Sequence, residues 1–191
     1  MAKNLKSTSK FLSYVLRHHP EVIGLRLDAE GWADIDDLVR LSTAHGRALS
    51  KELITEVART SEKQRFAIKE DGNFIRANQG HSIEVNMNLP SSEPPDVLFH
   101  GTASRFVRSI RSQGLLAGTR QHVHLSEAWS TAIEVGKRHG KPLVLGVDAL
   151  AMKKDGYLFF RAENGVWLTR EVPARYLEFP DEYRSNKFFG K

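Results

Sequence analysis

The sequence predicts an α+β protein of two lobes, and three features of the chain support this prediction. Up to residue 83, helical periodicity is followed by a hairpin pattern, whereas residues 97–180 are richer in short apolar strands. Between them, residues 84–96 (EVNMNLPSSEPPD) lose periodicity and gain Pro and Ser. We therefore expect lobes over residues 1–83 and 97–180, a linker over 84–96 and a basic tail over 181–191.

Composition narrows the class of protein. The chain has 191 residues, no cysteine and a formal net charge of +5, so it forms no disulfide and uses no thiolate chemistry. It shows neither a signal segment nor an apolar run of membrane-spanning length, so we expect a cytoplasmic protein without a membrane partner. The positive charge favours a polyanionic partner such as nucleic acid, although charge alone is weak support.

The N-terminal lobe begins with a helix predicted over residues 7–18, because apolar residues recur on one face. Its candidate N-caps are Ser7, Thr8 and Ser9. Pro20 disfavours helical geometry at the preceding residue, so the helix is expected to end near Arg17 and His18. That end presents two side chains able to carry positive charge.

The rest of this lobe is marked by caps and turns. The stretch GLRLDAEGWADI predicts a short strand, a turn and a helix that Asp34 caps and Gly46 ends. Ser50 caps a third helix, and RFAIKEDGNFIRA predicts a hairpin that turns at Asp71-Gly72. Three helices followed by a hairpin are typical of a winged-helix-like lobe.

The C-terminal lobe is organised around two strands that carry polar side chains. A short strand over Val97–Phe99 is predicted to end in His100-Gly101-Thr102. A second short strand is predicted around residue 124. Because side chains alternate along a strand, its residues His122, His124 and Ser126 share one face. Two strands ending in His and Ser or Thr suit binding of a sugar and a pyrophosphate.

Helices and a hairpin complete this lobe. A helix over 104–113, ended by Gly114, carries an apolar face formed by Phe106, Val107 and Ile110. A further helix is expected over 126–138, Pro142 opens the buried strand LVLGV, and LFFRAENGVWLT predicts a hairpin at Asn164-Gly165.

Single polar clusters leave alternatives open. Arg17 and His18 complement a helix C-terminus as solvated cations, and Arg65 is explained equally well as a charge at the hairpin edge. Arginine is also a good phosphate ligand, because its guanidinium binds phosphate oxygens in bidentate fashion. The segment Gly80-His81-Ser82 is either a tight turn or a place where backbone amides approach an anion.

Several other site types lack their motifs. His122 and His124 share a strand face, but no HExxH motif or acidic partner at ligand spacing accompanies them, so no metal is expected. The GxSxG motif of a serine hydrolase and the GxGxxG motif of a Rossmann dinucleotide site are absent from the sequence.

The motifs SKFLSYVLRHHP, GWADIDDL, KQRFAI, QGHS, FHGT, RQHVHLS and NGVWLT follow one another across nearly the whole chain. In this order they resemble the RNA 2′-phosphotransferases, enzymes that use NAD⁺ to remove a splice-junction 2′-phosphate from tRNA. The resemblance implies an N-terminal winged-helix RNA lobe, a C-terminal ADP-ribosyltransferase-like lobe and an active site between them. NAD would be consumed as co-substrate, with no metal.

The resemblance also assigns residues. The catalytic set it implies is Arg17, His18, Arg65 and Arg120. The NAD-binding set it implies is His100, Gly101, Thr102, His124, Leu125, Ser126 and Val166. Val166 stands where many protein-modifying ADP-ribosyltransferases have a glutamate, which suits a phosphate nucleophile that a carboxylate would repel. The RNA phosphate is expected to meet Gly80, His81 and Ser82.

Two other functions remain open at this stage. The same site could transfer ADP-ribose to a terminal phosphate of a nucleic acid and stop there, leaving a capped end. A winged-helix DNA-binding regulator with a degenerate nucleotide lobe is the non-enzymatic alternative, but the histidines and Arg120 of the second lobe are intact. The expected partners are 2′-phosphorylated RNA and NAD, and the expected state is a monomer.

Overall fold

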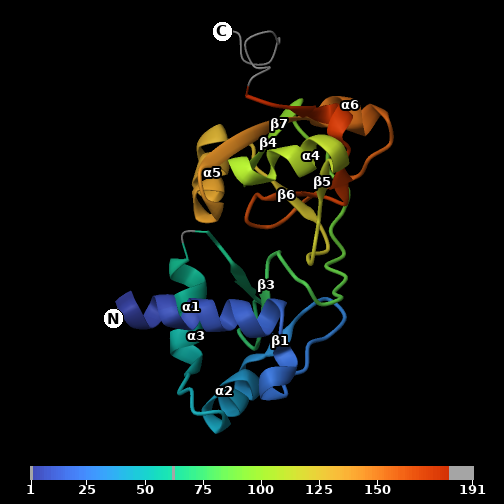
Figure 1. Cartoon of the computed structure of the whole chain (residues 1–191). Coiled ribbons are helices and arrows are strands. Elements are labelled where there is room, and N and C mark those ends of the chain that lie inside the picture. Colours follow the sequence, from blue (N-terminus) through green and yellow to red (C-terminus); the bar gives the residue numbers. More distant parts are fainter. Residues whose placement is uncertain (1, 62, 181–191) are drawn as a thin grey trace. The chain divides into compact units, whose positions relative to one another are not determined.

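The protein is described by a computed structural model that covers residues 2–61 and 63–180 (Figure 1). The chain divides into two compact units, Met1–Asn88 and Leu89–Lys191, and the division falls within the predicted linker. Both units mix helices with small antiparallel sheets, which agrees with the predicted α+β class. The predicted basic tail lies outside the described residues.

In the first unit, α1 spans Ala2–Arg17 and therefore begins earlier than predicted. The prediction of N-caps at Ser7, Thr8 and Ser9 is wrong, because all three lie inside the helix. The missed signal is Leu5, which packs against the core and extends the apolar stripe by two turns. The predicted end near Arg17 is confirmed, and η1 (Pro20–Ile23) follows.

Side-chain caps set the starts of the next two helices. The Asp34 carboxylate accepts a hydrogen bond from the amide of Asp37 and starts α2 (Ile35–Ala44). The Ser50 hydroxyl accepts from the amide of Leu53 and starts α3 (Lys51–Thr60). Both predicted caps are confirmed.

The sheet of this unit has the order β1-β3-β2 and is antiparallel throughout. Its strands are β1 (Ala33–Asp34), β2 (Phe66–Ile68) and β3 (Phe74–Ala77). The hairpin turn at Asp71-Gly72 is confirmed, with Gly72 at a φ of 70°. The strand predicted in GLRLDA is absent there, and only the two residues of β1 pair with β3. Figure 1 shows α1 crossing α3, and both helices contribute to one core.

In the second unit, β4 spans Val97–Ala103 and pairs with β7 (Pro142–Asp148) along its whole length. The prediction of a strand ending at Phe99 is too short, because His100-Gly101-Thr102 continues the ladder with β7. A third strand, β11 (Leu177–Glu178), pairs with the other edge of β7.

A second three-stranded sheet has the order β6-β9-β8, and its hairpin at Asn164-Gly165 is confirmed. Its strands are β6 (Val123–Leu125), β8 (Phe159–Arg161) and β9 (Trp167–Thr169). An isolated bridge joins Phe99 of β4 to Ser126, with both backbone bonds at 2.8 and 2.9 Å. This bridge brings the two histidine-bearing strands together. Strands β5 (Leu115–Leu116) and β10 (Glu171–Val172) form a separate two-stranded sheet.

The helices of this unit depart from the predictions in three ways. The predicted 104–113 helix is η2 (Ser104–Phe106) followed by α4 (Val107–Gln113). Phe106 was predicted on the apolar face of this helix, but its side chain is exposed. The helix predicted from residue 126 begins later, as α5 (Trp129–Gly136) continued by η3 (Lys137–His139), because the Ser126 backbone is bonded to Phe99. Two helices were not predicted, α6 (Ala149–Lys154) and η4 (Ala174–Tyr176).

Close packing of β4 against α5 depends on Gly101. A Cβ built there would lie 1.7 Å from the carbonyl oxygen of Ala132, so no larger residue fits. Gly136 is also confined, because a Cβ built there would lie 2.6 Å from the Thr102 carbonyl oxygen. The absent side chain of Gly101 thus points at the helix, while its neighbours His100 and Thr102 point to the other face of the strand.

No helix in the described residues has the length and apolar character needed to cross a bilayer.

Candidate functional site

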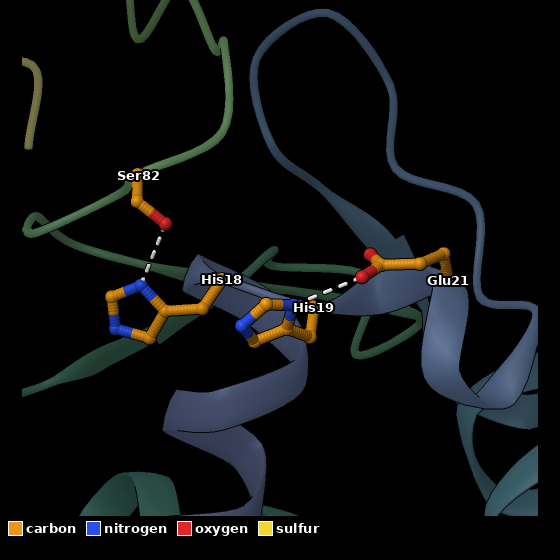
Figure 2. Close-up of polar contacts among 4 residues, drawn as sticks. All are labelled: His18, His19, Glu21 and Ser82. Atoms are coloured by element: carbon orange, nitrogen blue, oxygen red, sulfur yellow. Dashed lines mark hydrogen bonds and ion pairs between the residues drawn. The ribbon is translucent and has the colours of Figure 1, made fainter. Parts of the chain in front are cut away.

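The end of α1 meets the loop that follows β3. Nδ1 of His18 lies 2.9 Å from the hydroxyl of Ser82, and the amide of Ser82 donates to the carbonyl oxygen of Arg17 at 2.9 Å. Figure 2 shows the His18 ring turned toward Ser82. Residues far apart in sequence thus hold the helix end and the loop together through one side-chain and one backbone bond.

Arg17 and Arg65 meet at the same loop. Nη2 of Arg17 lies 3.5 Å from the carbonyl oxygen of Arg65, and a Cβ at Gly80 would lie 3.6 Å from Nη1 of Arg17. Gly80 has a φ of 89°, which disfavours other residues there. The absence of a side chain therefore lets the loop backbone approach the guanidinium. Five of the predicted phosphate residues are thereby neighbours: Arg17, His18, Arg65, Gly80 and Ser82.

His81 occupies a different environment from its neighbours in the loop. Its side chain is only 3% exposed, and burial lowers its pKa to about 4, helped by the positive charges of Arg17, His18 and Arg76. Its imidazole is therefore neutral at pH 7 and packs near Gly31 and Val85. Burial is the larger cause of the lowered pKa, and the neighbouring positive charges add to it.

His19, which lies beside the motif but outside the predicted set, has its own partner. Nδ1 of His19 contacts Oε1 of Glu21 at 2.9 Å, and this bond lowers the pKa of the Glu21 carboxyl. Figure 2 shows the two histidines turned to different partners. The structure therefore separates His18 from His19, which sequence adjacency could not do.

In the second unit, His100 of β4 and His124 of β6 are linked. Nδ1 of His100 lies 3.0 Å from the carbonyl oxygen of His124, so Nδ1 carries the proton and donates it. Burial lowers the pKa of His100, which makes the neutral form dominant at pH 7. Nε2 of His100 is then a hydrogen-bond acceptor.

Arg120 lies beside His124. Its Nη1 is 3.5 Å from Nδ1 of His124, and because a guanidinium only donates, that nitrogen accepts. The second unit thus gathers an acceptor nitrogen, a guanidinium and a second imidazole around the junction of β4 and β6.

The remaining predicted NAD-binding residues differ in burial and in backbone contacts. Thr102 and Leu125 are buried, and Leu125 pairs with Trp167 of β9. Ser126 is partly exposed and forms the bridge to Phe99, while Val166 directly precedes β9. The role of each in binding stays a prediction, and Gly101 has a packing role of its own.

Sequence reasoning missed one carboxylate near this junction. Oε1 of Glu127 accepts from Nε1 of Trp167 at 2.8 Å and pairs with Nη2 of Arg161 at 3.1 Å. No local signal marks it, because both partners lie on the distant β8–β9 hairpin. Its charge is engaged by Arg161, and Val166 leaves the adjoining position without a carboxylate.

Within residues 2–61 and 63–180 no three His, Asp or Glu side chains group as a metal site. Arg120 belongs to the second unit and Arg17, His18 and Arg65 to the first. Their convergence on one phosphate stays a prediction.

Comparison with known proteins identifies the family. A family model described as "RNA 2'-phosphotransferase, Tpt1 / KptA family" matches residues 3–171. A protein of Acaryochloris marina, named a probable RNA 2′-phosphotransferase, is 58% identical over 92% of this chain and 97% of its own. Proteins of the same name from Pseudomonas aeruginosa and Flavobacterium johnsoniae are 55% and 52% identical, over 92% and 91% of this chain and 97% and 96% of their own. The chain therefore belongs to the RNA 2′-phosphotransferase, Tpt1 / KptA family.

Proposed function

We propose that this protein removes an internal 2′-phosphate from RNA, of the tRNA splice-junction type, by transferring it to NAD. The products are RNA with a 2′-hydroxyl, nicotinamide and ADP-ribose 1″,2″-cyclic phosphate. Family membership supports the 2′-phosphotransferase activity. The observation that carries the residue assignment is the cluster of Arg17, His18 and Ser82 where α1 meets the loop after β3.

The proposed reaction has two balanced steps. First, an oxygen of the RNA 2′-phosphate attacks C1″ of the NAD ribose, and nicotinamide leaves with the electron pair of the broken C1″–N bond. Second, the neighbouring 2″-hydroxyl loses its proton and attacks phosphorus, the P–O2′ bond breaks, and the departing 2′-oxygen takes up a proton. Each step needs positive charge around a phosphate and precise alignment of the attacking oxygen.

The first unit supplies groups suited to the RNA phosphate. Arg17 and Arg65 donate to phosphate oxygens. The positive charges that add to the effect of burial on the pKa of His81 also attract the dianion. His18 is placed to act as the general acid for the departing 2′-oxygen, with its Nδ1 fixed by Ser82. The arrangement of α1, α2, α3 and β1-β3-β2 supports the assignment of this unit as a winged-helix RNA lobe.

The residues of the second unit fit NAD as a co-substrate. Neutral His100 has an acceptor nitrogen, as a ribose hydroxyl requires, and Arg120 carries a positive charge for anionic oxygens. The missing carboxylate at Val166 suits a phosphate nucleophile, which needs no deprotonation. These features support an ADP-ribosyltransferase-like lobe that binds NAD along the junction of β4 and β6.

The test is incubation of the purified protein with RNA that carries a labelled internal 2′-phosphate, with and without NAD. We expect label to move to ADP-ribose cyclic phosphate only when NAD is present. NAD-independent release of inorganic phosphate would contradict the proposal. Retention of ADP-ribose on a terminal phosphate, without a cyclic product, would favour the capping reaction instead.

A further inference from the structure

A basic groove runs between α1 and α3 in the first unit. Of the residues that line it, Arg65 alone is assigned to a site above. Its volume is about 670 Å³, and Leu5 and Val57 contribute its apolar part. Positive charges and hydroxyl groups supply the rest of its lining, namely Lys6, Lys10, Lys63, Arg65, Ser9, Ser13, Thr60 and Ser61. None of the described residues that line it is acidic.

The polar residues of α1 form a continuous stripe. Lys6, Lys10, Ser13 and Arg17 recur at intervals of three and four, so they share one face of the helix. Helix α1 contains no Asp or Glu that would neutralise this face. At 1.5 Å per residue the stripe extends for about 16 Å, from the first lysine to the arginine of the proposed phosphate cluster.

Arg65 connects the groove to that cluster. Arg65 is among the residues that line the groove, and its carbonyl oxygen contacts Arg17 at 3.5 Å. A polymer lying in the groove would therefore reach the proposed phosphate site at the end of α1. Exposed lysines and hydroxyls beside such a path are the groups that bind sugar-phosphate backbones without reading base sequence.

Resting on the proposed function, we infer that this groove binds the single-stranded RNA backbone flanking the 2′-phosphorylated nucleotide. Lys6 and Lys10 contact phosphodiesters beyond the reacting nucleotide, and the hydroxyls of Ser9 and Ser13 supply neutral hydrogen bonds. The consequence is that RNA length and salt affect substrate binding, whereas the reacting phosphate is handled by the cluster at Arg17. Lys6 and Lys10 are thus specificity residues for a polymeric substrate.

The experiment uses the variant Lys6→Gln/Lys10→Gln in the full chain. Its control, Lys141→Gln/Lys154→Gln, removes the same charge from exposed positions of the second unit. A fluorescent single-stranded RNA without any 2′-phosphate is titrated at several salt concentrations. We expect the groove variant to bind RNA more weakly. Each lost phosphate contact should reduce the slope of log K against log salt by about 0.7, so the loss of two lysines should reduce it by about 1.4. The control variant should keep the wild-type slope.

A second measurement separates this inference from the proposed function. A 2′-phosphorylated dinucleotide is compared with the same dinucleotide embedded in a longer strand, each with NAD. The groove variant should raise KM for the longer strand and leave the ratio of kcat to KM for the dinucleotide near that of the control. Equal slopes and equal KM values for the two double variants would overturn the groove assignment. If the wild type converts neither substrate, the proposed function fails, yet the binding titration still tests the groove.

Discussion

Nδ1 of His18 and the hydroxyl of Ser82 lie 2.9 Å apart although 64 residues separate them. The contact fixes one nitrogen of the ring, so a proton given to substrate must leave from Nε2. Ser82 is exposed and its amide is bonded to Arg17, so the hydroxyl adds orientation rather than fold stability. This makes Ser82 a positioning residue for the acid proposed at His18.

The first prediction follows from this contact. Ser82→Ala should lower the rate of the second step by roughly 2–10-fold, the value of one hydrogen bond, while Ser82→Thr keeps the hydroxyl and should restore the rate. His18→Ala is the reference, and loss of the acid should slow that step by about 10²–10⁴-fold. A single-turnover time course with labelled RNA measures both steps, because slowing of the second makes the ADP-ribosylated RNA intermediate accumulate.

Step selectivity distinguishes positioning from a structural role. Because Ser82 contacts the ring proposed as the acid, Ser82→Ala should slow the second step and leave the first unchanged, whereas general loosening of the fold would slow both steps. If His18→Ala instead prevents the intermediate from forming, the imidazole acts in the first step or in phosphate binding, and the acid assignment is wrong.

The second prediction concerns NAD. His100→Asn keeps an amide donor near the position of Nδ1 but removes the acceptor Nε2. We expect NAD affinity to fall by roughly 2–10-fold, as for one lost hydrogen bond, with affinity for unmodified RNA unchanged because the groove lies in the other unit. Calorimetry with NAD alone measures the NAD affinity, and titration with unmodified RNA supplies the control. Unaltered NAD affinity would remove His100 from the binding site.

Local signals made much of the fold predictable. Asp34 and Ser50 cap helices and Gly72 and Gly165 form turns through contacts a few residues away, so the sequence nearby contains the whole cause. The bridge between Phe99 and Ser126 has no such local cause. It consumes the backbone groups of Ser126 and delays α5, which sequence periodicity alone could not indicate.

The candidate site shows the same limit. Motifs named His18 and Ser82 separately, but their pairing depends on how the loop after β3 returns to the end of α1. His81 lies within the same motif, yet its side chain is buried and neutral. A residue's identity in a motif therefore did not specify which way its side chain points. Glu127 was missed because its partners come from a distant hairpin.

The third prediction tests the packing of β4 on α5. Gly101→Ala places a Cβ 1.7 Å from a backbone carbonyl oxygen, so the strand or the helix must move. We expect the free energy of unfolding to fall by at least about 3 kcal/mol, the upper part of the overpacking range. Urea denaturation measures it. The control is Gly118→Ala, whose Cβ meets open space at a φ of 64° and should cost only about 1 kcal/mol from backbone strain. Equal losses for the two variants would show that steric packing at Gly101 is unimportant.

The fourth prediction concerns acid stability and the buried His81. Its folded-state pKa of about 4 lies below the ordinary value of 6.5, so the unfolded chain binds the proton more readily. Stability from this residue is complete above pH 6.5 and is lost as the pH falls toward 4, by about 3 kcal/mol in all. His100, whose pKa burial also lowers, adds loss in the same direction.

Urea denaturation across this pH range provides the measurement, with His81→Asn as the test variant and the exposed His139→Asn as the matched control. The test variant is expected to be less stable than wild type at pH 7, because it disturbs a packed site near Gly31 and Val85. Its stability should nevertheless fall less steeply with acidification, since the group that takes up the proton on unfolding is gone. The facing charges of Arg17, His18 and Arg76 oppose protonation of the native imidazole, so Arg76→Gln should flatten the profile in part. A profile for His81→Asn as steep as that of wild type would mean that His81 gains its proton without unfolding.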